Sequence, residues 1–285
     1  MDEPAPAPRR TLVVLHAHPD DEALLTAGTM ARAAAHGHRV VLVVATDGAL
    51  GQTDESAFGA KGGPLATTRS AELAASARAL GVARTVELGY ADSGSGPEVL
   101  PDPDGGRRFV RVPLDEAAGA VCAVLVEERA DVLTTYDPNG GYGHRDHVRV
   151  HEVGARAAEL ARERGLEVRV LWATVPRDLL CRALDLVARI YRFPPEFDRS
   201  SFDRAFAKKS EITHRVSVRR FASAKRAAMR AHSSQAADSA GGDRTLGMLV
   251  RIPRPLYDVV FGREWFVDPD APAGAARTDV FEGLS

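Results

Sequence analysis

The sequence has few cysteines and no apolar run near its start long enough for a membrane span, and both shortages narrow the class of protein. Only Cys122 and Cys181 occur in 285 residues. Two cysteines do not make a disulfide framework, so we expect a reduced, cytoplasmic chain. The first apolar run, Leu12 to Leu15, is too short for a signal peptide or a membrane span. We therefore expect no export signal and no membrane anchor.

An excess of charge of one sign is also lacking. The chain has 39 acidic residues against 37 Lys plus Arg, a formal net charge of -2. Such a balance creates no basic field for a polyphosphate backbone, so nucleic acid is not an expected partner. The apolar fraction of 45% and charged fraction of 27% are those of an ordinary soluble globular protein. The scarcity of lysine among the basic residues is typical of a high-GC bacterial coding sequence.

Short apolar, β-branched runs alternate with longer amphipathic segments through the first two thirds of the chain. This pattern is typical of βαβ units on a parallel sheet, so we expect an α/β, Rossmann-like, three-layer fold with a mostly parallel sheet. The expected strands are Thr11 to His16, Arg39 to Ala45, Thr85 to Leu88, Val132 to Thr135 and Glu167 to Ala173. The expected helices are Glu22 to Ala35, Thr67 to Leu80, Leu114 to Glu128 and His144 to Arg164.

The alternation weakens after Pro176, which suggests a division of the chain. We expect a catalytic core over residues 1–175, a smaller C-terminal cap over 176–268 that completes the substrate pocket, and a loose tail over 269–285. Within the cap, the pattern predicts a helix near Leu179 to Ile190, a strand over Glu211 to Val218, a helix that ends near His232, and irregular structure beyond it.

The first expected strand ends in a cluster of ionisable side chains, HAHPDDE at 16–22. A dinucleotide-binding domain would place a glycine-rich turn here, whereas these carboxylates would repel a pyrophosphate. Imidazole and carboxylate at close spacing are ligands that zinc accepts. The acids could equally cap the following helix. Taken alone, the segment leaves both interpretations open.

A second cluster, YDPNGGYGHRDH at 136–147, follows the fourth expected strand, and His151 comes shortly after it. On a helix, His144, His147 and His151 share one face. Because the carboxyl ends of parallel strands meet at one edge of the sheet, the two clusters should converge there. Together they favour a metal site over a merely solvated helix start.

The HPDDE segment at 18–22 and the GHRDH segment at 143–147 resemble the signature of the LmbE-like (PIG-L-type) zinc N-deacetylases. The resemblance extends from Leu12 to the AHSSQ segment at 231–235, and it is nearest to the mycothiol-pathway members of actinobacteria. It implies that His18, Asp21 and His147 ligate zinc, although the same ligands accept Fe²⁺. It also implies that Asp20 is the general base.

Further roles follow from the same resemblance. His144 is similar to the residue that stabilises the tetrahedral oxyanion, and Tyr142 to one that polarises the carbonyl or gates the site. Asp146 either orients His144 or is only an acid in the first helical turn. Arg69 and Asp92 match positions that bind the sugar.

The chain departs from the mycothiol-pathway pattern at Gln52, where those enzymes carry an acid, and at Ser95, where they carry a larger apolar residue. We therefore expect the chemistry to be retained and the aglycone to differ. His151 is expected on a helix face, His232 either beside the pocket or at a helix end, and Trp265 in packing.

The resemblance implies a metal-dependent N-deacetylase that hydrolyses the acetamide of an N-acetylglucosamine-containing small molecule or glycoconjugate. One alternative is an amidase acting on a larger amide such as a mycothiol S-conjugate. Another is a non-catalytic sugar-binding relative, which Asp20 argues against because a pure binder has no use for an unpaired carboxylate beside a metal. The sequence leaves open a homo-oligomer.

Overall fold

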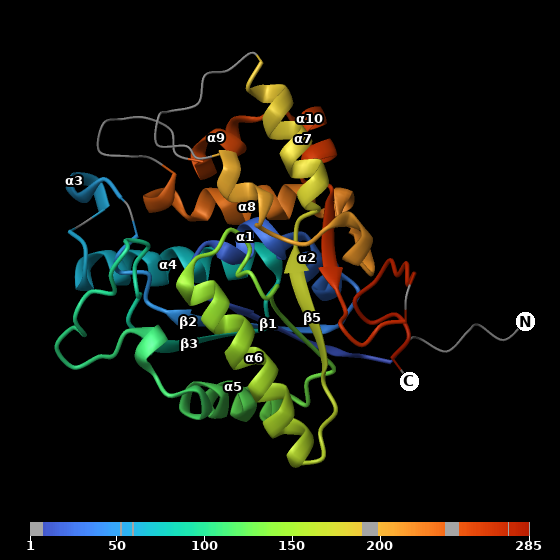
Figure 1. Cartoon of the computed structure of the whole chain (residues 1–285), viewed down its shortest axis with the longest axis horizontal. Coiled ribbons are helices and arrows are strands. Elements are labelled where there is room, and N and C mark those ends of the chain that lie inside the picture. Colours follow the sequence, from blue (N-terminus) through green and yellow to red (C-terminus); the bar gives the residue numbers. More distant parts are fainter. Residues whose placement is uncertain are drawn as a thin grey trace, which may run out of the picture.

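The structure, a computed structural model, describes residues 8–51, 53–58, 60–189, 199–236, 245–272 and 274–284. Figure 1 shows the arrangement of the helices and strands. The strands are β1 (Thr11–His16), β2 (Arg39–Thr46), β3 (Arg84–Tyr90), β4 (Val132–Tyr136), β5 (Arg169–Thr174), β6 (His214–Ser217) and β7 (Arg263–Val267). The helices are α1 (Asp21–Leu25), α2 (Ala27–Ala35), α3 (Glu55–Phe58), α4 (Gly63–Leu80), α5 (Leu114–Glu128), α6 (Arg145–Glu163), α7 (Arg177–Val187), α8 (Ala222–Ala231), α9 (Thr245–Arg251) and α10 (Arg254–Val260).

The strands of the described ranges form one sheet in the order β3-β2-β1-β4-β5-β7-β6. The first five are parallel, while β7 runs antiparallel to both β5 and β6. The chain passes outward from β1 to β2 on one side and returns to β4 on the other. The strand order therefore reverses between β1 and β4, which is where open parallel sheets bind ligands.

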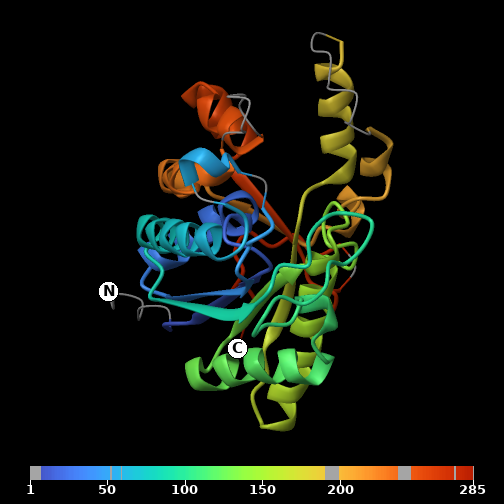
Figure 2. The same cartoon turned by 90° about the vertical axis from the view of Figure 1, so that its left-hand side faces the viewer.

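Helices cover both faces of the sheet, so the expected three-layer α/β fold is confirmed. α2, α4 and α8 pack on one face, and α5 and α6 pack on the other (Figures 1 and 2). Alternate residues of β1 face opposite ways: Leu12 and Val14 enter one core, and Val13 and Leu15 enter the other. A strand covered on both faces reads as a continuous apolar run, which explains why the strands are visible in the sequence.

The expected single helix over residues 22–35 is wrong, because the chain breaks between α1 and α2 at Thr26. Its backbone has φ -132° and ψ -4°, outside the helical range. The Thr26 hydroxyl lies 2.8 Å from Nε2 of buried His16. The new helix start is capped by the carboxylate of Glu264, which accepts hydrogen bonds from the N–H groups of Gly28 and Thr29 at 2.9 and 2.7 Å.

The C-terminal part of the chain contains more regular structure than the sequence predicts. α9, α10 and β7 follow the segment around His232, where we expected irregular structure. β6 and β7 extend the same sheet rather than forming a separate one. The boundary between core and cap stays a prediction.

The expected loose tail differs from the structure over residues 269–272 and 274–284. Val280 is only 2% exposed and packs into the core on the α2 side of the sheet. Arg277 bonds the carboxylate of Asp268 at 2.7 Å, and Arg169 donates to the carbonyl of Glu282 at 2.7 Å. The contact of Arg169 with Glu282 joins residues 113 apart, so local sequence composition could not reveal it. In the described ranges, no helix is both long and apolar enough to cross a bilayer.

Candidate metal centre

The end of β1 carries the first half of the site to the edge of the sheet where β1 and β4 are neighbours. The backbone N–H of His18 donates to Oδ2 of Asp21 at 2.9 Å, so this short turn brings the two side chains together. Asp20, between them, has φ 145°, a conformation that residues other than glycine rarely adopt. The chain then enters α1.

The end of β4 supplies the second half through a glycine-rich turn. Gly140 has φ 64°, and a Cβ atom there would lie 2.7 Å from the backbone nitrogen of Val148, so only glycine fits this position. The turn ends at His144, whose side chain caps α6 by accepting a hydrogen bond from the N–H of Asp146. His147 is therefore in the first turn of α6, buried and facing β1.

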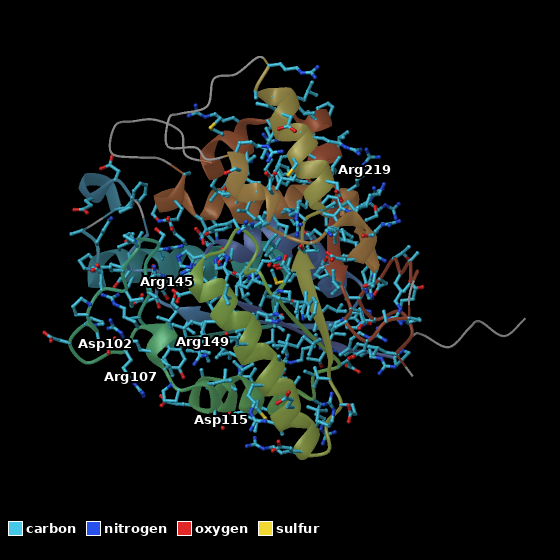
Figure 3. The ribbon with its side chains drawn as sticks, in the orientation of Figure 1. Asp102, Arg107, Asp115, Arg145, Arg149 and Arg219 are labelled. Atoms are coloured by element: carbon cyan, nitrogen blue, oxygen red, sulfur yellow. The ribbon has the colours of Figure 1, made fainter. Side chains whose placement is uncertain are left out.

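Contacts with the neighbouring loop fix the start of α6. The guanidinium of Arg145 donates to the carbonyl of Gly96, and that of Arg149 donates to the carbonyl of Val112. Both carbonyls belong to the connection between β3 and α5. This connection also carries Asp102, which lies on the same side of the molecule as Arg145 and Arg149 (Figure 3). The histidines at the helix start are thus held by two long-range anchors.

Three donor atoms from these two halves form a nearly equilateral triangle. Nδ1 of His18 is 3.2 Å from Oδ2 of Asp21 and 3.4 Å from Nε2 of His147, and the latter two atoms are 3.3 Å apart. Bonds of about 2.0–2.1 Å to a tetrahedral zinc ion place its ligand atoms about 3.3 Å from one another. Two imidazoles and one carboxylate at this spacing fit a catalytic zinc ion, which keeps further positions open.

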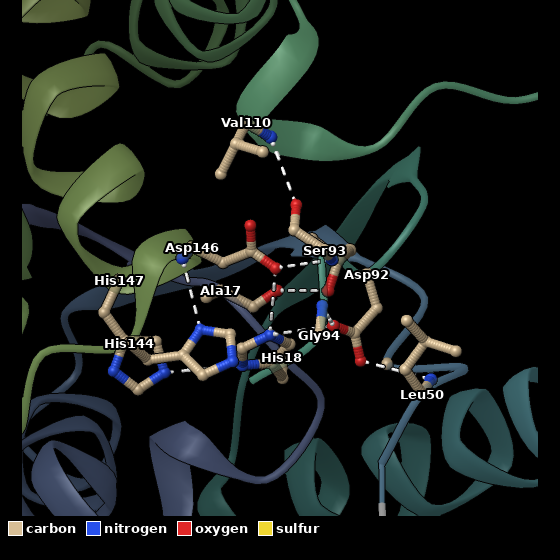
Figure 4. Close-up of polar contacts among 12 residues, drawn as sticks. Ala17, His18, Leu50, Asp92, Ser93, Gly94, Val110, His144, Asp146 and His147 are labelled. Atoms are coloured by element: carbon tan, nitrogen blue, oxygen red, sulfur yellow. Dashed lines mark hydrogen bonds and ion pairs between the residues drawn. The ribbon is translucent and has the colours of Figure 1, made fainter. Parts of the chain in front are cut away.

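The two histidines are oriented by groups behind them. Nδ1 of His147 faces the carbonyl of Gly140 at 3.2 Å, and its ring stacks on Tyr136 with centroids 4.2 Å apart. Nε2 of His18 faces Asp146 at 3.3 Å and Asp92 at 3.7 Å (Figure 4). Such partners of metal-binding histidines fix the ring orientation and the tautomer.

The carboxylates of the site stabilise positive charge on the neighbouring imidazole of His18. Burial lowers the pKa of His18, but Asp146, Asp21 and Asp92 outweigh it and hold that pKa well above its ordinary value. Burial raises the pKa of Asp21, but His147 and His18 outweigh it and hold that pKa well below its ordinary value. Several carboxylates around two imidazoles suit a bound cation.

Asp20 stands beside this triangle with its carboxylate against Arg69. Oδ1 of Asp20 is 3.0 Å from Nη2 of Arg69, and the Asp20 side chain is 26% exposed. Loss of hydration raises the pKa of the Asp20 carboxyl, although Arg69 opposes this effect. A partly exposed carboxylate next to a ligand could exchange a proton with a water molecule or a substrate.

His144 also approaches the triangle, with ligand atoms of His18, His144 and His147 all within 4.8 Å of one another. Its hydrogen bond argues against a ligand role. Because Nδ1 accepts the N–H of Asp146 at 3.2 Å, the neutral ring carries its proton on Nε2, where it can only donate. Burial, together with the nearby His18 and His147, lowers the pKa of His144 to about 4, so the ring is a neutral donor at neutral pH.

Tyr142 lies at the open side of the site. It is 56% exposed, and its ring meets that of His147 edge-on with centroids 5.0 Å apart. Partial loss of hydration against the neighbouring side chains, together with the nearby Asp21, raises the pKa of Tyr142, so the phenol stays protonated. The hydroxyl is therefore a donor beside His144.

The two expected sugar-binding residues lie close to the site but are largely buried. Arg69 is 2% exposed and also donates to the carbonyl of Gly48 at 2.8 Å. Asp92 is 4% exposed and accepts hydrogen bonds from the N–H groups of Leu50 and Gly94 at 3.2 and 2.8 Å. Their roles as sugar contacts stay predictions.

The other residues that the sequence analysis considered do not belong to the triangle. His151 lies on α6 with Nδ1 3.0 Å from the carbonyl of Tyr136, outside the triangle. His232 is fully buried against Glu22. Trp265 packs on β7 beside the small apolar cluster around Ile212. Gln52 lies outside the described residues.

Sequence reasoning missed the position of one carboxylate and the importance of another. Asp146 orients the ring of His18 rather than that of His144; only its backbone N–H touches His144. Glu22, interpreted as a helix-capping acid or part of the metal cluster, is instead fully buried and bonded to His232, 210 residues away. For the contact between Glu22 and His232, the sequence offered one signal: the HPDDE segment at 18–22 and the AHSSQ segment at 231–235 both carry the family resemblance.

Comparisons with known proteins agree on one group. The sequence model described as GlcNAc-PI de-N-acetylase (PIG-L) matches residues 13–158. A Streptomyces avermitilis protein named 1D-myo-inositol 2-acetamido-2-deoxy-alpha-D-glucopyranoside deacetylase is 36% identical, over 98% of this chain and 98% of that protein. A Saccharomonospora viridis protein of the same name is 35% identical, over 96% of this chain and all of that protein.

A solved structure shares the fold. N,N'-diacetylchitobiose deacetylase from Pyrococcus horikoshii superposes with a TM-score of 0.57 at 20% identity, over 91% of this chain and 82% of that chain. At this identity the likeness concerns the fold alone.

Proposed function

The chain belongs to the PIG-L family of GlcNAc-PI de-N-acetylases, and from this premise we propose that it is a metal-dependent deacetylase of an N-acetylglucosamine-containing small molecule. The observation that carries the proposal is the triangle of His18, Asp21 and His147, whose edges of 3.2 to 3.4 Å suit a tetrahedral ion. His144 borders this triangle, with its ring centroid 5.0 Å from that of His147, and Asp20 directly precedes the proposed ligand Asp21 in the chain.

We propose zinc as the ion and these three side chains as its ligands. Both nitrogens and the carboxylate are donors that zinc accepts, and Fe²⁺ would accept them too. When bound, zinc supplies the Lewis acidity that lowers the pKa of a water molecule to about 7 and polarises an amide carbonyl.

The protein's own groups then carry the proton transfers. Asp20 accepts a proton from the attacking water as its oxygen bonds to the acetyl carbon. Nε2–H of His144, and the hydroxyl of Tyr142, donate to the carbonyl oxygen as it gains negative charge. Asp20 returns the proton to the amide nitrogen when the C–N bond breaks. The products are acetate and the free amine.

The relatives' name directs the choice of substrate. A glycoside in which N-acetylglucosamine is joined to inositol is the first candidate, and Arg69 and Asp92 are proposed to help hold its sugar. Ser95 lies in the same loop as Asp92, and we propose that the aglycone pocket differs from that of the relatives at this position. Both cysteines are unpaired, which supports a reducing, cytoplasmic location.

Acetate release from a panel of N-acetylglucosaminides, measured with the purified protein, tests the function. We expect release that a chelator abolishes and that zinc restores, with Fe²⁺ compared as the second metal. The preferred aglycone identifies the substrate. If the metal-loaded protein releases no acetate but cleaves a cysteinyl amide of a mycothiol conjugate, the larger-amide alternative replaces this proposal. If it cleaves neither and binds the sugars, the protein is a sugar-binding relative.

A further inference from the structure

The backbone of the proposed base is held in an unfavourable conformation. Asp20 has φ 145° and ψ -25°, whereas most residues with positive φ in the described ranges are glycines. A non-glycine residue keeps such a conformation only when its surroundings impose it, and such residues cluster at functional sites. The conformation aims the Asp20 carboxylate at Arg69 while Asp21 turns toward His18.

The carboxylate of Glu22 bonds the backbone of Asp20 directly. The N–H of Asp20 donates to Oε2 of Glu22 at 3.0 Å, and the carbonyl of Asp20 accepts the N–H of Ala23 at 3.0 Å. Both polar groups of the Asp20 backbone are thereby engaged within one helical turn. Rotation of this backbone toward an ordinary conformation would break the bond to Oε2.

Glu22 is itself anchored from two distant elements through its other oxygen. Oε1 accepts the hydroxyl of Ser76 on α4 at 2.6 Å and lies 2.6 Å from Nε2 of His232, at the end of α8. Glu22, Ser76 and His232 are all 0% exposed. Water therefore cannot compete for this carboxylate, and its direction is set by the two anchors.

We propose that Glu22 is a positioning residue that keeps Asp20 in its catalytic backbone conformation, with His232 and Ser76 fixing the Glu22 carboxylate. The two carboxylate oxygens of Glu22 have different partners. Oε1 is bonded to Ser76 and His232, and Oε2 accepts the backbone N–H of Asp20. A buried ion pair that served only stability would not need an oxygen on the backbone of the proposed base. This inference rests on the proposed deacetylase function.

The chain offers a matched control in Glu72 on α4. Its carboxylate accepts the hydroxyl of Ser233 at 2.8 Å and the N–H and hydroxyl of Ser234 at 2.7 and 2.6 Å. Glu72 thus fastens the segment next to His232 without touching Asp20. Loss of Glu72 should loosen the same segment and leave the Asp20 backbone in place.

The test compares Glu22→Ala, Glu22→Gln and Glu72→Ala as full-length, zinc-loaded proteins. In Glu22→Ala we expect kcat to fall about 10- to 100-fold, with KM and zinc content close to wild type, because the base is misplaced. Glu22→Gln keeps an oxygen for the N–H of Asp20 and should recover most of kcat. Glu72→Ala should lower Tm while kcat stays close to wild type.

Two results would overturn the inference: a zinc-loaded Glu22→Ala protein with wild-type kcat, or an equal loss of kcat in Glu72→Ala. A second readout, hydrogen exchange of the Asp20 amide, covers the case in which Glu22→Ala does not fold. In His232→Ala this amide should exchange faster than in wild type, and unchanged exchange would contradict the positioning role. Exchange is measured without substrate, so it still decides the inference if the wild-type protein releases no acetate and the proposed function fails.

Discussion

Nε2 of His18 faces Oδ2 of Asp146 at 3.3 Å, on the opposite side of the ring from Nδ1, which faces the other proposed ligands. Asp146 is 0% exposed and also accepts the N–H of Ser93 at 2.9 Å, so its carboxylate is fixed in direction. An imidazole held in this way has its second nitrogen free for a metal and is a stronger donor.

The substitution Asp146→Asn should therefore weaken zinc binding. Loss of a carboxylate behind a metal-binding histidine lowers affinity by about 10- to 100-fold. Competition with a chromophoric chelator measures the dissociation constant. Asp104→Asn removes an exposed acid that is not part of the triangle and should leave the constant unchanged. Unaltered affinity in Asp146→Asn would mean that His18 does not depend on this carboxylate.

Asp20→Asn should remove turnover and spare the metal. The amide cannot accept a proton, and removal of a general base lowers kcat by about 10²- to 10⁴-fold. The amide oxygen can still pair with Arg69, so the fold and the zinc content should persist. Metal analysis and acetate release on the same sample provide the measurement. Activity that survived in the zinc-loaded variant would show that another group accepts the proton.

A carboxylate far from the site should make stability depend on pH. Glu128 at the end of α5 is bonded by Arg39 and by Arg84, the latter at 2.8 Å, and this pairing lowers its pKa from 4.5 to about 2. Because the folded pKa is depressed, its contribution is complete above the unfolded pKa and is lost as pH falls from about 4.5 toward 2.

The comparison with Glu128→Gln isolates this contribution. The difference in free energy of unfolding between wild type and variant should be largest near pH 6 and should shrink by pH 3, as measured by urea unfolding. A difference that stayed constant over this range would show that the pairing of Glu128 with Arg39 does not lower its pKa. Other groups titrate in both proteins, so their effects cancel in the difference.

Packing of α6 on β4 should respond to one added methyl group. A Cβ atom at Gly154 would lie 2.3 Å from Cγ2 of Thr135, so Gly154→Ala should destabilise the protein by about 1–3 kcal/mol. A Cβ atom at Gly119 on α5 would have no neighbouring atom within 4 Å, so Gly119→Ala should stabilise the protein by about 0.5–1 kcal/mol. Thermal unfolding of both variants checks the opposite signs; a stabilised Gly154→Ala would mean that α6 can move away from the sheet.

The succession of the five parallel strands and the contents of the site clusters were predictable for local reasons. Strands buried on both faces are continuous apolar runs, so β1 was predicted with its observed bounds and β2 and β4 to within one residue. The clusters at 16–22 and 136–147 each follow such a run, and parallel strands carry their ends to one edge.

Other features depended on partners far along the chain. The break at Thr26 is stabilised by the contact of Thr26 with His16 and by the hydrogen bond that Glu264 accepts at the start of α2. β7 is a short strand of mixed polarity, and it forms because it pairs with β5 and β6.

The sequence by itself determined that the clusters at 16–22 and 136–147 would reach one edge of the sheet, because each cluster directly follows a buried strand and the strands are parallel. Only the tertiary structure decided that the Asp146 carboxylate orients the ring of His18 and that His144 carries its proton on Nε2. It also decided that the Glu22 carboxylate accepts the N–H of Asp20. These relations are hydrogen bonds whose direction is set by burial and by contacts between distant elements. No local pattern encodes such contacts, since each partner alone has several ways to satisfy its polar atoms.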